Sequence, residues 1–239
     1  MIRKLMQNRE RHEADSKRNY EVQRIETFSD GVFAFAVTLL IVSLEVPKNF
    51  SELMINMRGF FAFGISFLLL VLIWMEQHRF FRKYGLEDHW TIALNVALLF
   101  LVLFYVYPLK FLFTLIFHNE IYGGDKPSVG ITEAQVPALM QIYSLGYMAI
   151  YLLFTLMYAH AYRRADFLGL TDIERFDCRT NIYKQVISGG VGVSSLICTL
   201  ILPLKLMDLS GIIYVLIGPA LTVFFFFRFK TRRKKFAAE

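Results

Sequence analysis

The chain has 239 residues, of which 56% are hydrophobic and 19% are charged, and its formal net charge is +6. A soluble domain of this length can build its core from far less apolar material, so the composition argues against a soluble protein and predicts an integral membrane protein. The two cysteines, Cys178 and Cys198, form no CxxC pair and show no metal-ligand spacing, and we expect both to be free thiols.

The first residues are polar and mixed in charge. They are too long and too charged for the start of a signal peptide, and no short apolar stretch with a small-residue cleavage site follows them. We therefore expect three parts. Residues 1–24 form a cytoplasmic N-terminal tail, residues 25–230 a six-helix transmembrane domain, and residues 231–239 a basic cytoplasmic C-terminal tail.

Six apolar segments follow the N-terminal tail, and each approaches the length of about 20 residues that a bilayer-spanning helix needs. They are Phe28–Val46, Gly59–Gln77, Trp90–Phe117, Val136–Tyr162, Val186–Leu202 and Ile212–Phe229. Charged or turn-forming stretches separate them, and we expect residues 163–184 to form a loop that contains Cys178. The sequence therefore predicts an all-α integral membrane protein with six transmembrane helices.

The distribution of positive charge predicts the orientation of these helices. Of the 26 Lys and Arg residues, 21 lie in the N-terminal tail, the second and fourth loops and the C-terminal tail. Loops rich in Lys and Arg remain in the cytoplasm, so both termini are expected there, in a multi-pass protein of the cell inner membrane. The membrane topology explains the excess of Lys and Arg. We therefore expect the lipid bilayer, and no nucleic acid, as a partner.

The first apolar segment carries one stripe of residues at helical spacing. With 100° per residue, Phe35, Thr38, Val42 and Glu45 all fall within about 40° of Gly31. The stripe is mainly apolar, with one hydroxyl in its middle and a carboxylate at its end. From spacing alone, a helix-packing face with an incidental threonine remains an alternative to a functional surface.

Three polar residues in the first three apolar segments are expected to meet. Asp30 lies beside the stripe, His78 shares a helix face with Trp74, and Asn95 lies in the third segment. Polar groups inside a membrane segment need partners, so we predict a hydrogen-bonded cluster of Asp30, His78 and Asn95. A purely structural role for this cluster remains open.

The sequence contains none of the usual signatures of an enzyme or a metal site. It has no Walker loop, no HExxH and no GxSxG, and its five histidines are scattered. The TVGYG filter of ordinary potassium channels is absent as well. We therefore expect no catalytic residues, no metal site and no cofactor.

The stretch from Arg24 to Gly31 reads RIETFSDG and carries the most specific motif of the chain. It matches the pattern RxxxFSDG, and the match continues through Trp74 and His78 to Asn95. On these residues the chain resembles the transmembrane protein 175 family of potassium channels, in its single-repeat bacterial form. The signature residues of the resemblance are Arg24, Phe28, Ser29, Asp30, Gly31, Trp74, His78 and Asn95.

The resemblance implies a potassium-selective channel that assembles as a homotetramer around its first helix. Potassium ions would be the permeant partner, and no cofactor is implied. The pore positions carried over to this sequence are Phe35, Thr38, Leu39 and Val42, with Glu45 at the pore mouth. The family often has an aliphatic residue at position 35, so Phe35 implies a tighter constriction.

A second interpretation remains, in which the chain is a proton-coupled secondary transporter or another proton-conducting membrane protein. Asp30, His78 and Glu45 would then be relay groups. A transporter is expected to show slow, saturable flux, whereas a channel shows unitary currents.

Overall fold

The computed structural model describes residues 24–42, 48–50, 53–54, 60–121, 131–203, 206 and 208–236. All the regular elements in this part of the chain are helical, as the sequence predicts. The long helices are α2 (Arg24–Val42), α4 (Phe60–Tyr84), α5 (His89–Ile121), α6 (Val136–Arg163), α7 (Asp172–Ile201) and α9 (Ile217–Phe236). The short elements are η1 (Glu133–Gln135), α8 (Asp208–Ile212) and η3 (Ile213–Leu216).

Five stretches of the described chain are long and apolar enough to cross a membrane. They are Phe63–Tyr84, His89–Leu112, Val136–Arg163, Asp172–Ile201 and Ser210–Phe236. Helix α2 is apolar from Val32 onward but begins with a charged stretch that holds Arg24, Glu26 and Asp30. The fold is thus a bundle of five or six apolar helices, which agrees with an integral membrane protein.

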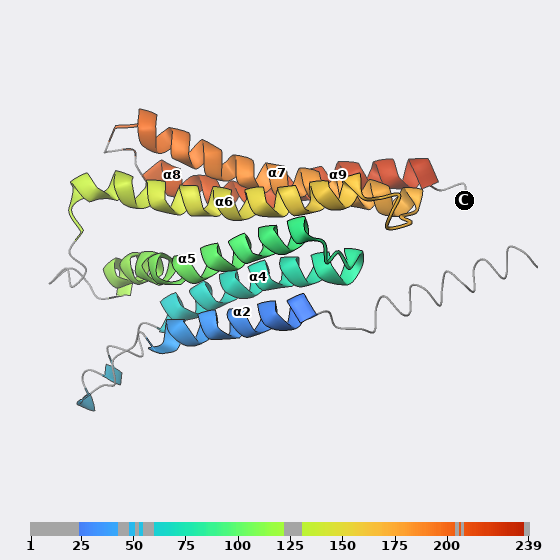
Figure 1. Ribbon diagram of the computed structural model, residues 1–239. Helices are drawn as coiled ribbons and strands as arrows, with labels where there is room; N and C mark the ends of the chain where they lie inside the picture. Colours follow the sequence, from blue (N-terminus) through green and yellow to red (C-terminus); the bar gives the residue numbers. More distant parts are fainter. Residues whose placement is uncertain are drawn as a thin grey trace, which may run out of the picture.

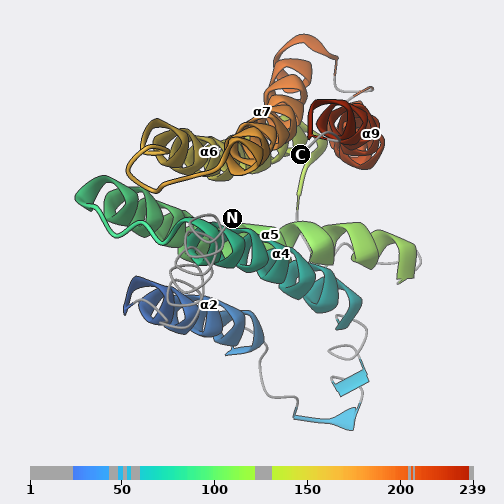
Figure 2. The ribbon, with the colours of Figure 1, turned by 90° about the vertical axis from the view of Figure 1, so that its right-hand side faces the viewer.

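The helices form two layers, which Figure 1 shows one above the other. Helices α2, α4 and α5 pack against one another in the first layer, and α6, α7 and α9 form the second. The layers meet mainly where α5 packs on α6, and Figure 2 shows the same division along the helix axes.

The first layer has its own apolar core. Phe33, Ala36 and Leu40 of α2 are buried against Leu70 of α4 and Leu99 of α5. The three α2 residues are three and four positions apart, so they lie on one face of the helix. Burial of this face fixes the rotation of α2 about its axis.

A second core joins the two layers where α4 ends. Phe80 and Tyr84 of α4 pack with Tyr158 of α6 and Cys178 of α7, and all four side chains are buried. Gly85 follows the last residue of α4, and its φ of 55° places it in the left-handed region that favours glycine. Its amide donates a hydrogen bond to the carbonyl oxygen of Phe81, 2.8 Å away.

Helix α7 starts about 14 residues earlier than its apolar segment, so the expectation of a loop over residues 163–184 is wrong for its second half. The Thr171 side chain accepts from the Glu174 amide, and the Glu174 carboxylate accepts from the Thr171 amide at 2.8 Å. This capping box stabilises a helix start in a charged sequence. Cys178 is consequently a buried helical residue, and its thiol donates to the Tyr158 carbonyl oxygen at 3.5 Å.

Small residues bring α6 and α7 close together. Ser188, Gly192 and Ser195 are buried along one face of α7. A Cβ atom on Gly192 would lie 3.0 Å from the Tyr147 ring and 3.4 Å from the α6 backbone. Such close approach of two backbones is typical of helix packing in membranes.

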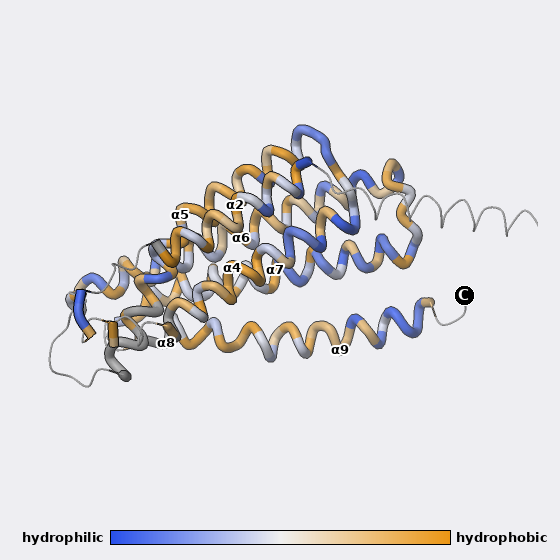
Figure 3. Tube along the Cα trace, turned by 90° about the horizontal axis from the view of Figure 1, so that it is seen from below, coloured by the Kyte–Doolittle hydropathy of each residue, from blue (hydrophilic) through white to orange (hydrophobic). Residues whose placement is uncertain are grey.

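One end of the bundle is hydrophilic, and we call it the polar end. It contains the start of α2 at Arg24, the ends of α4, α6 and α9 at Tyr84, Arg163 and Phe236, and the start of α7 at Asp172. Figure 3 shows the hydrophilic residues of α9 gathered beside the C-terminus. Helix α9 continues without a break across position 230, where the sequence predicts that the C-terminal tail begins.

Candidate functional site

Helix α2 turns an uncovered face away from the rest of its layer. Gly31, Phe35 and Thr38 are exposed, opposite the buried Phe33, Ala36 and Leu40, and the Phe35 side chain is 55% exposed. A Cβ atom added to Gly31 would meet nothing within 4 Å, so no contact inside the chain requires glycine there. The stripe expected from helical spacing therefore lies on the outer side of α2.

The hydroxyl hydrogen of Thr38 is already used within α2. Its Oγ1 donates to the carbonyl oxygen of Ala34 one turn back, at 2.7 Å. This is the bond that an incidental threonine in a membrane helix makes. It also orients the hydroxyl, because an oxygen whose hydrogen points along the helix keeps its lone pairs for acceptor contacts.

Of the other pore positions expected from the sequence, the structure describes the side chain of Leu39 but not those of Val42 and Glu45. Leu39 is half-buried and packs against the core of the first layer, so it lies at the flank of the exposed face. Val42 is the last residue of α2, and its side chain lies outside what the structure describes. Glu45 also lies outside the described residues.

A buried chain of hydrogen bonds joins the three helices of the first layer. The Gln77 amide donates to Asn95 Oδ1 at 3.1 Å, and Asn95 Nδ2 donates to Ser29 Oγ at 2.9 Å. Ser29 in turn donates to the Ile25 carbonyl oxygen at 2.7 Å. Each polar group thus has a partner in an apolar interior, as membrane helices require.

Asp30 and His78 do not join this chain, so the expected cluster of Asp30, His78 and Asn95 requires correction. Asp30 is exposed and accepts a 2.7 Å hydrogen bond from Trp74 Nε1, and the Trp74 ring stacks on His78 with centroids 5.4 Å apart. One residue along a helix is a rotation of 100°, so Ser29 faces Asn95 while Asp30 turns outward.

The other two signature residues lie near the start of α2 on its outer side. Arg24 and Phe28 are both exposed. In a single chain they therefore contribute no buried contact, unlike Ser29 and Asn95.

The opposite end of α2 is held by a lysine that sequence reasoning did not single out. Lys110 Nζ of α5 donates to the carbonyl oxygen of Leu40 at 3.2 Å. The last carbonyl groups of a helix lack partners within it, and a cation near them is favourable. Lys110 thereby ties the C-terminal turn of α2 to α5.

A buried carboxylate, Glu76, links the two layers, and sequence reasoning also missed it. It accepts from Tyr158 Oη of α6 at 2.9 Å, and from Lys184 Nζ and Gln185 Nε2 of α7 at 2.5 Å each. An acidic residue inside an apolar segment was the available signal. The predicted loop over residues 163–184 contains Lys184 and ends beside Gln185, so hydropathy does not place these partners on a helix that faces Glu76.

The turn between α4 and α5 is tied to α6 through Asp88. Asp88 Oδ1 accepts from the Thr91 amide at 3.0 Å, and Oδ2 lies 2.5 Å from His160 Nε2. Partial burial raises the pKa of Asp88, but hydrogen bonds from Thr91 and His160 outweigh it and lower this pKa to about 2.

Among the described residues, no group of three or more His, Cys, Asp or Glu side chains is placed to hold a metal ion. Paired groups such as Asp88 and His160 instead connect helices to one another. The exposed face of α2 is the strongest candidate for a functional surface.

Comparison with known proteins identifies the family of the chain. A family model described as the endosomal/lysosomal potassium channel TMEM175 matches residues 24–108, which hold α2, α4 and most of α5. A potassium channel of Marivirga tractuosa is 43% identical over 220 residues, covering 87% of this chain and 88% of its own. A potassium channel of Chamaesiphon minutus is 32% identical over 149 residues, covering 59% and 66%.

Two solved structures share the fold. The T38A variant of the potassium channel MtTMEM175, in complex with a nanobody–MBP fusion protein, superposes with a TM-score of 0.80 at 39% identity. The match covers 89% of this chain and 95% of that one. A lysosomal potassium-selective channel TMEM175 homologue from Chamaesiphon minutus gives a TM-score of 0.57 at 25% identity, covering 84% and 96%.

Proposed function

Because this chain belongs to the TMEM175 family, we propose that it is a potassium channel whose pore is lined by α2. The family comprises channels and not enzymes, and the relatives with high coverage carry the name potassium channel. The observation that supports the site is the outer face of α2, which leaves Gly31, Phe35 and Thr38 uncovered in a single chain.

One α2 helix cannot enclose a pore, so the proposal requires several copies. Four copies of α2 around a common axis would cover the exposed face in a homotetramer. Gly31 supports this arrangement, because an outward-facing glycine with open space around it lets another helix approach closely. Protein that conducts potassium while strictly monomeric would contradict it.

In the tetramer, the four Thr38 side chains would form a ring of oxygen atoms. Their lone pairs are available because each hydroxyl hydrogen bonds Ala34. An oxygen ring replaces part of a cation's hydration shell, which apolar rings cannot do. Potassium releases its water more easily than sodium, so such a ring favours potassium.

Apolar residues would form the constriction of this pore. Phe35 is proposed as the narrowest ring, because its ring is large and uncovered. Leu39 and Val42 would add further apolar rings, and Glu45 would lie at the pore mouth. A narrow apolar ring opposes the passage of ions by excluding water.

The proposed topology has six membrane crossings, with α2 as the first, and both termini in the cytoplasm at the inner membrane. The basic residues at the polar end support this orientation. Residues 1–24 and 231–239 would flank the channel domain as tails.

The proposal is tested by potassium flux and reversal potentials of purified protein in liposomes. Wild-type protein should give unitary currents with potassium preferred over sodium, and Thr38→Ala should lower the permeability ratio while Thr38→Ser retains most of it. Thr155→Ala is the matched control, because Thr155 makes the same 2.7 Å bond to the carbonyl one turn back, on α6.

The possible outcomes separate the hypotheses. Equal reversal potentials for wild type and Thr38→Ala would exclude the hydroxyl ring as the filter. Slow, saturable flux without unitary currents would instead support the proton-coupled transporter.

A further inference from the structure

Two adjoining cavities lie at the polar end of the bundle. One has a volume of about 470 Å³ and is lined by residues of α4, α6 and α7, while the other has about 590 Å³ and lies between α4, α7 and α9. Lys83 and Asn181 line both, so the two cavities adjoin, and we call them together the crevice.

The crevice is strongly basic. Its walls hold six Lys or Arg side chains against two carboxylates, those of Glu76 and Asp177. The basic residues are Arg79, Arg82, Lys83, Lys184, Arg228 and Arg232. The excess of positive charge makes the crevice suited to an anion.

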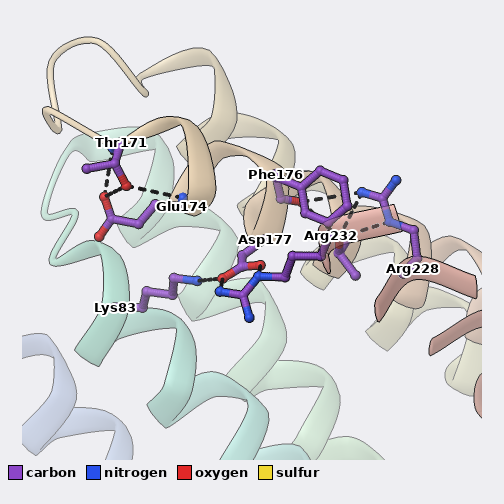
Figure 4. Close-up of polar contacts among 8 residues, drawn as sticks. Lys83, Thr171, Glu174, Phe176, Asp177, Arg228 and Arg232 are labelled. Atoms are coloured by element: carbon purple, nitrogen blue, oxygen red, sulfur yellow. Dashed lines mark hydrogen bonds and ion pairs between the residues drawn. The ribbon is translucent and has the colours of Figure 1, made fainter. Parts of the chain in front are cut away.

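The crevice is also a built structure and not a loose group of surface charges. Asp177 of α7 lies 3.8 Å from Lys83 Nζ of α4 and 3.3 Å from Arg232 Nε of α9, as Figure 4 shows. Arg228 donates to Thr180 Oγ1 at 2.8 Å, and its guanidinium lies 4.0 Å from the centre of the Phe176 ring. These contacts hold three helices in place around the cavities.

One wall of the crevice is apolar and open to the surroundings of the bundle. Phe225, Phe226 and Phe229 of α9 line it and remain exposed. No described residue of α9 is buried, because this helix packs on α7 with one side only. A basic pocket therefore continues directly into a phenylalanine surface.

We propose that this crevice binds a phospholipid with an anionic headgroup, independently of potassium conduction. The phosphate lies among Arg79, Arg82 and Lys83, and an acyl chain runs along Phe225 and Phe226. The proposed topology places the crevice at the cytoplasmic leaflet, where basic pockets between helices meet anionic lipids. Charge complementarity selects the headgroup, and the apolar wall distinguishes a lipid from a free phosphate.

The test is a lipid titration of the full-length protein, purified in an uncharged detergent, with the thermal unfolding midpoint as the readout. The three probes are dioctanoyl phosphatidylglycerol, dioctanoyl phosphatidylcholine and glycerol 3-phosphate. Phosphatidylglycerol should raise the midpoint in a saturable way, and the other two should not. Arg79→Gln/Arg82→Gln should increase the half-saturating concentration of phosphatidylglycerol about thirtyfold.

Control variants outside the crevice test whether the effects of substitution are specific to its residues. Lys230→Gln/Lys234→Gln removes the same charge from exposed positions of α9 outside the crevice, and should change the half-saturating concentration less than twofold. Phe225→Ala/Phe226→Ala should weaken binding, whereas Phe227→Ala, on the same helix but outside the crevice, should not. The phenylalanine variants decide the question if the arginine variant does not fold.

Three results would overturn the proposal. Equal shifts of the unfolding midpoint with phosphatidylglycerol and phosphatidylcholine would show that the charge of the headgroup does not determine binding. Saturation by glycerol 3-phosphate at the same concentration would indicate a free-phosphate site. Equal weakening by the crevice and control lysine variants would indicate a general surface effect. Because the readout is binding, none of these results depends on whether the protein conducts potassium.

Discussion

The buried pair of Glu76 and Lys184 should be the strongest polar contact between the two layers. The side chains are 11% and 19% exposed, and Nζ lies 2.5 Å from Oε2. Glu76→Gln keeps the shape and an acceptor for Tyr158 but leaves the Lys184 ammonium without its anion. Breaking a buried pair in this way should lower the free energy of unfolding by about 3 kcal/mol.

The double variant Glu76→Gln/Lys184→Met removes both charges together. It should be less destabilised than the sum of the single variants, with a coupling free energy of about 2–3 kcal/mol. The measurement is equilibrium unfolding in mixed micelles of dodecyl maltoside and sodium dodecyl sulfate, followed by the fluorescence of Trp74 and Trp90.

A second pair in the chain provides the control. Arg175 Nη2 and Asp166 Oδ1 are also 2.5 Å apart, but the Asp166 side chain is 91% exposed. Exposed pairs are screened by water, so Asp166→Asn and Arg175→Met should have additive effects. Similar coupling in the two cycles, or none in the buried one, would refute the reasoning, because burial is the main difference between the pairs.

Three further predictions concern other parts of the molecule. Asn95→Ala strands Ser29 and Gln77 and should lower the free energy of unfolding by about 1–3 kcal/mol in the same titration; an unchanged midpoint would contradict the buried chain. Phe35→Ala should widen the proposed constriction and raise potassium current in liposomes, and an unchanged current would place the constriction elsewhere. Asp88→Asn should destabilise the protein above about pH 4, and the difference should shrink as the pH falls and vanish only below about pH 2, because the native pKa is about 2 and its ordinary value is 3.8; a constant difference in thermal midpoint over this range would contradict this.

The residues that share each face of α2 were predictable from the sequence, but not which face packs on its neighbours. Gly31, Phe35 and Thr38 repeat at the same three- and four-residue spacing as Phe33, Ala36 and Leu40, and both sets are mainly apolar. Helical spacing therefore places each set on one side of the helix without saying which side contacts α4 and α5.

The partners of individual polar residues could not be predicted in the same way. Ser29 and Asp30 are adjacent and so point in directions about 100° apart around α2, but the spacing does not say which of them faces Asn95. Charge suggested Asp30, whereas a fully buried position accepts the neutral hydroxyl of Ser29 more readily. Distance in the sequence hid the pairing of Glu76 with Lys184, which are 108 residues apart.

The helix over residues 172–185 was missed for a different reason. Hydropathy detects the part of a helix that lies in lipid, and it does not detect an extension into water. The extension depends on a local signal, the capping box of Thr171 and Glu174, and on the burial of Cys178 against the ends of α4 and α6. A search for caps ahead of each apolar segment would have found it.

The close packing of α6 on α7 has a consequence for motion. Two backbones that approach through Ser188, Gly192 and Ser195 have little room to slide, because any shift would drive the Tyr147 ring into the α7 backbone. Helices α6 and α7 should therefore move as one rigid unit. Any rearrangement of α2 should then be absorbed by the first layer and by the contact between α5 and α6, with the distance between α6 and α7 unchanged.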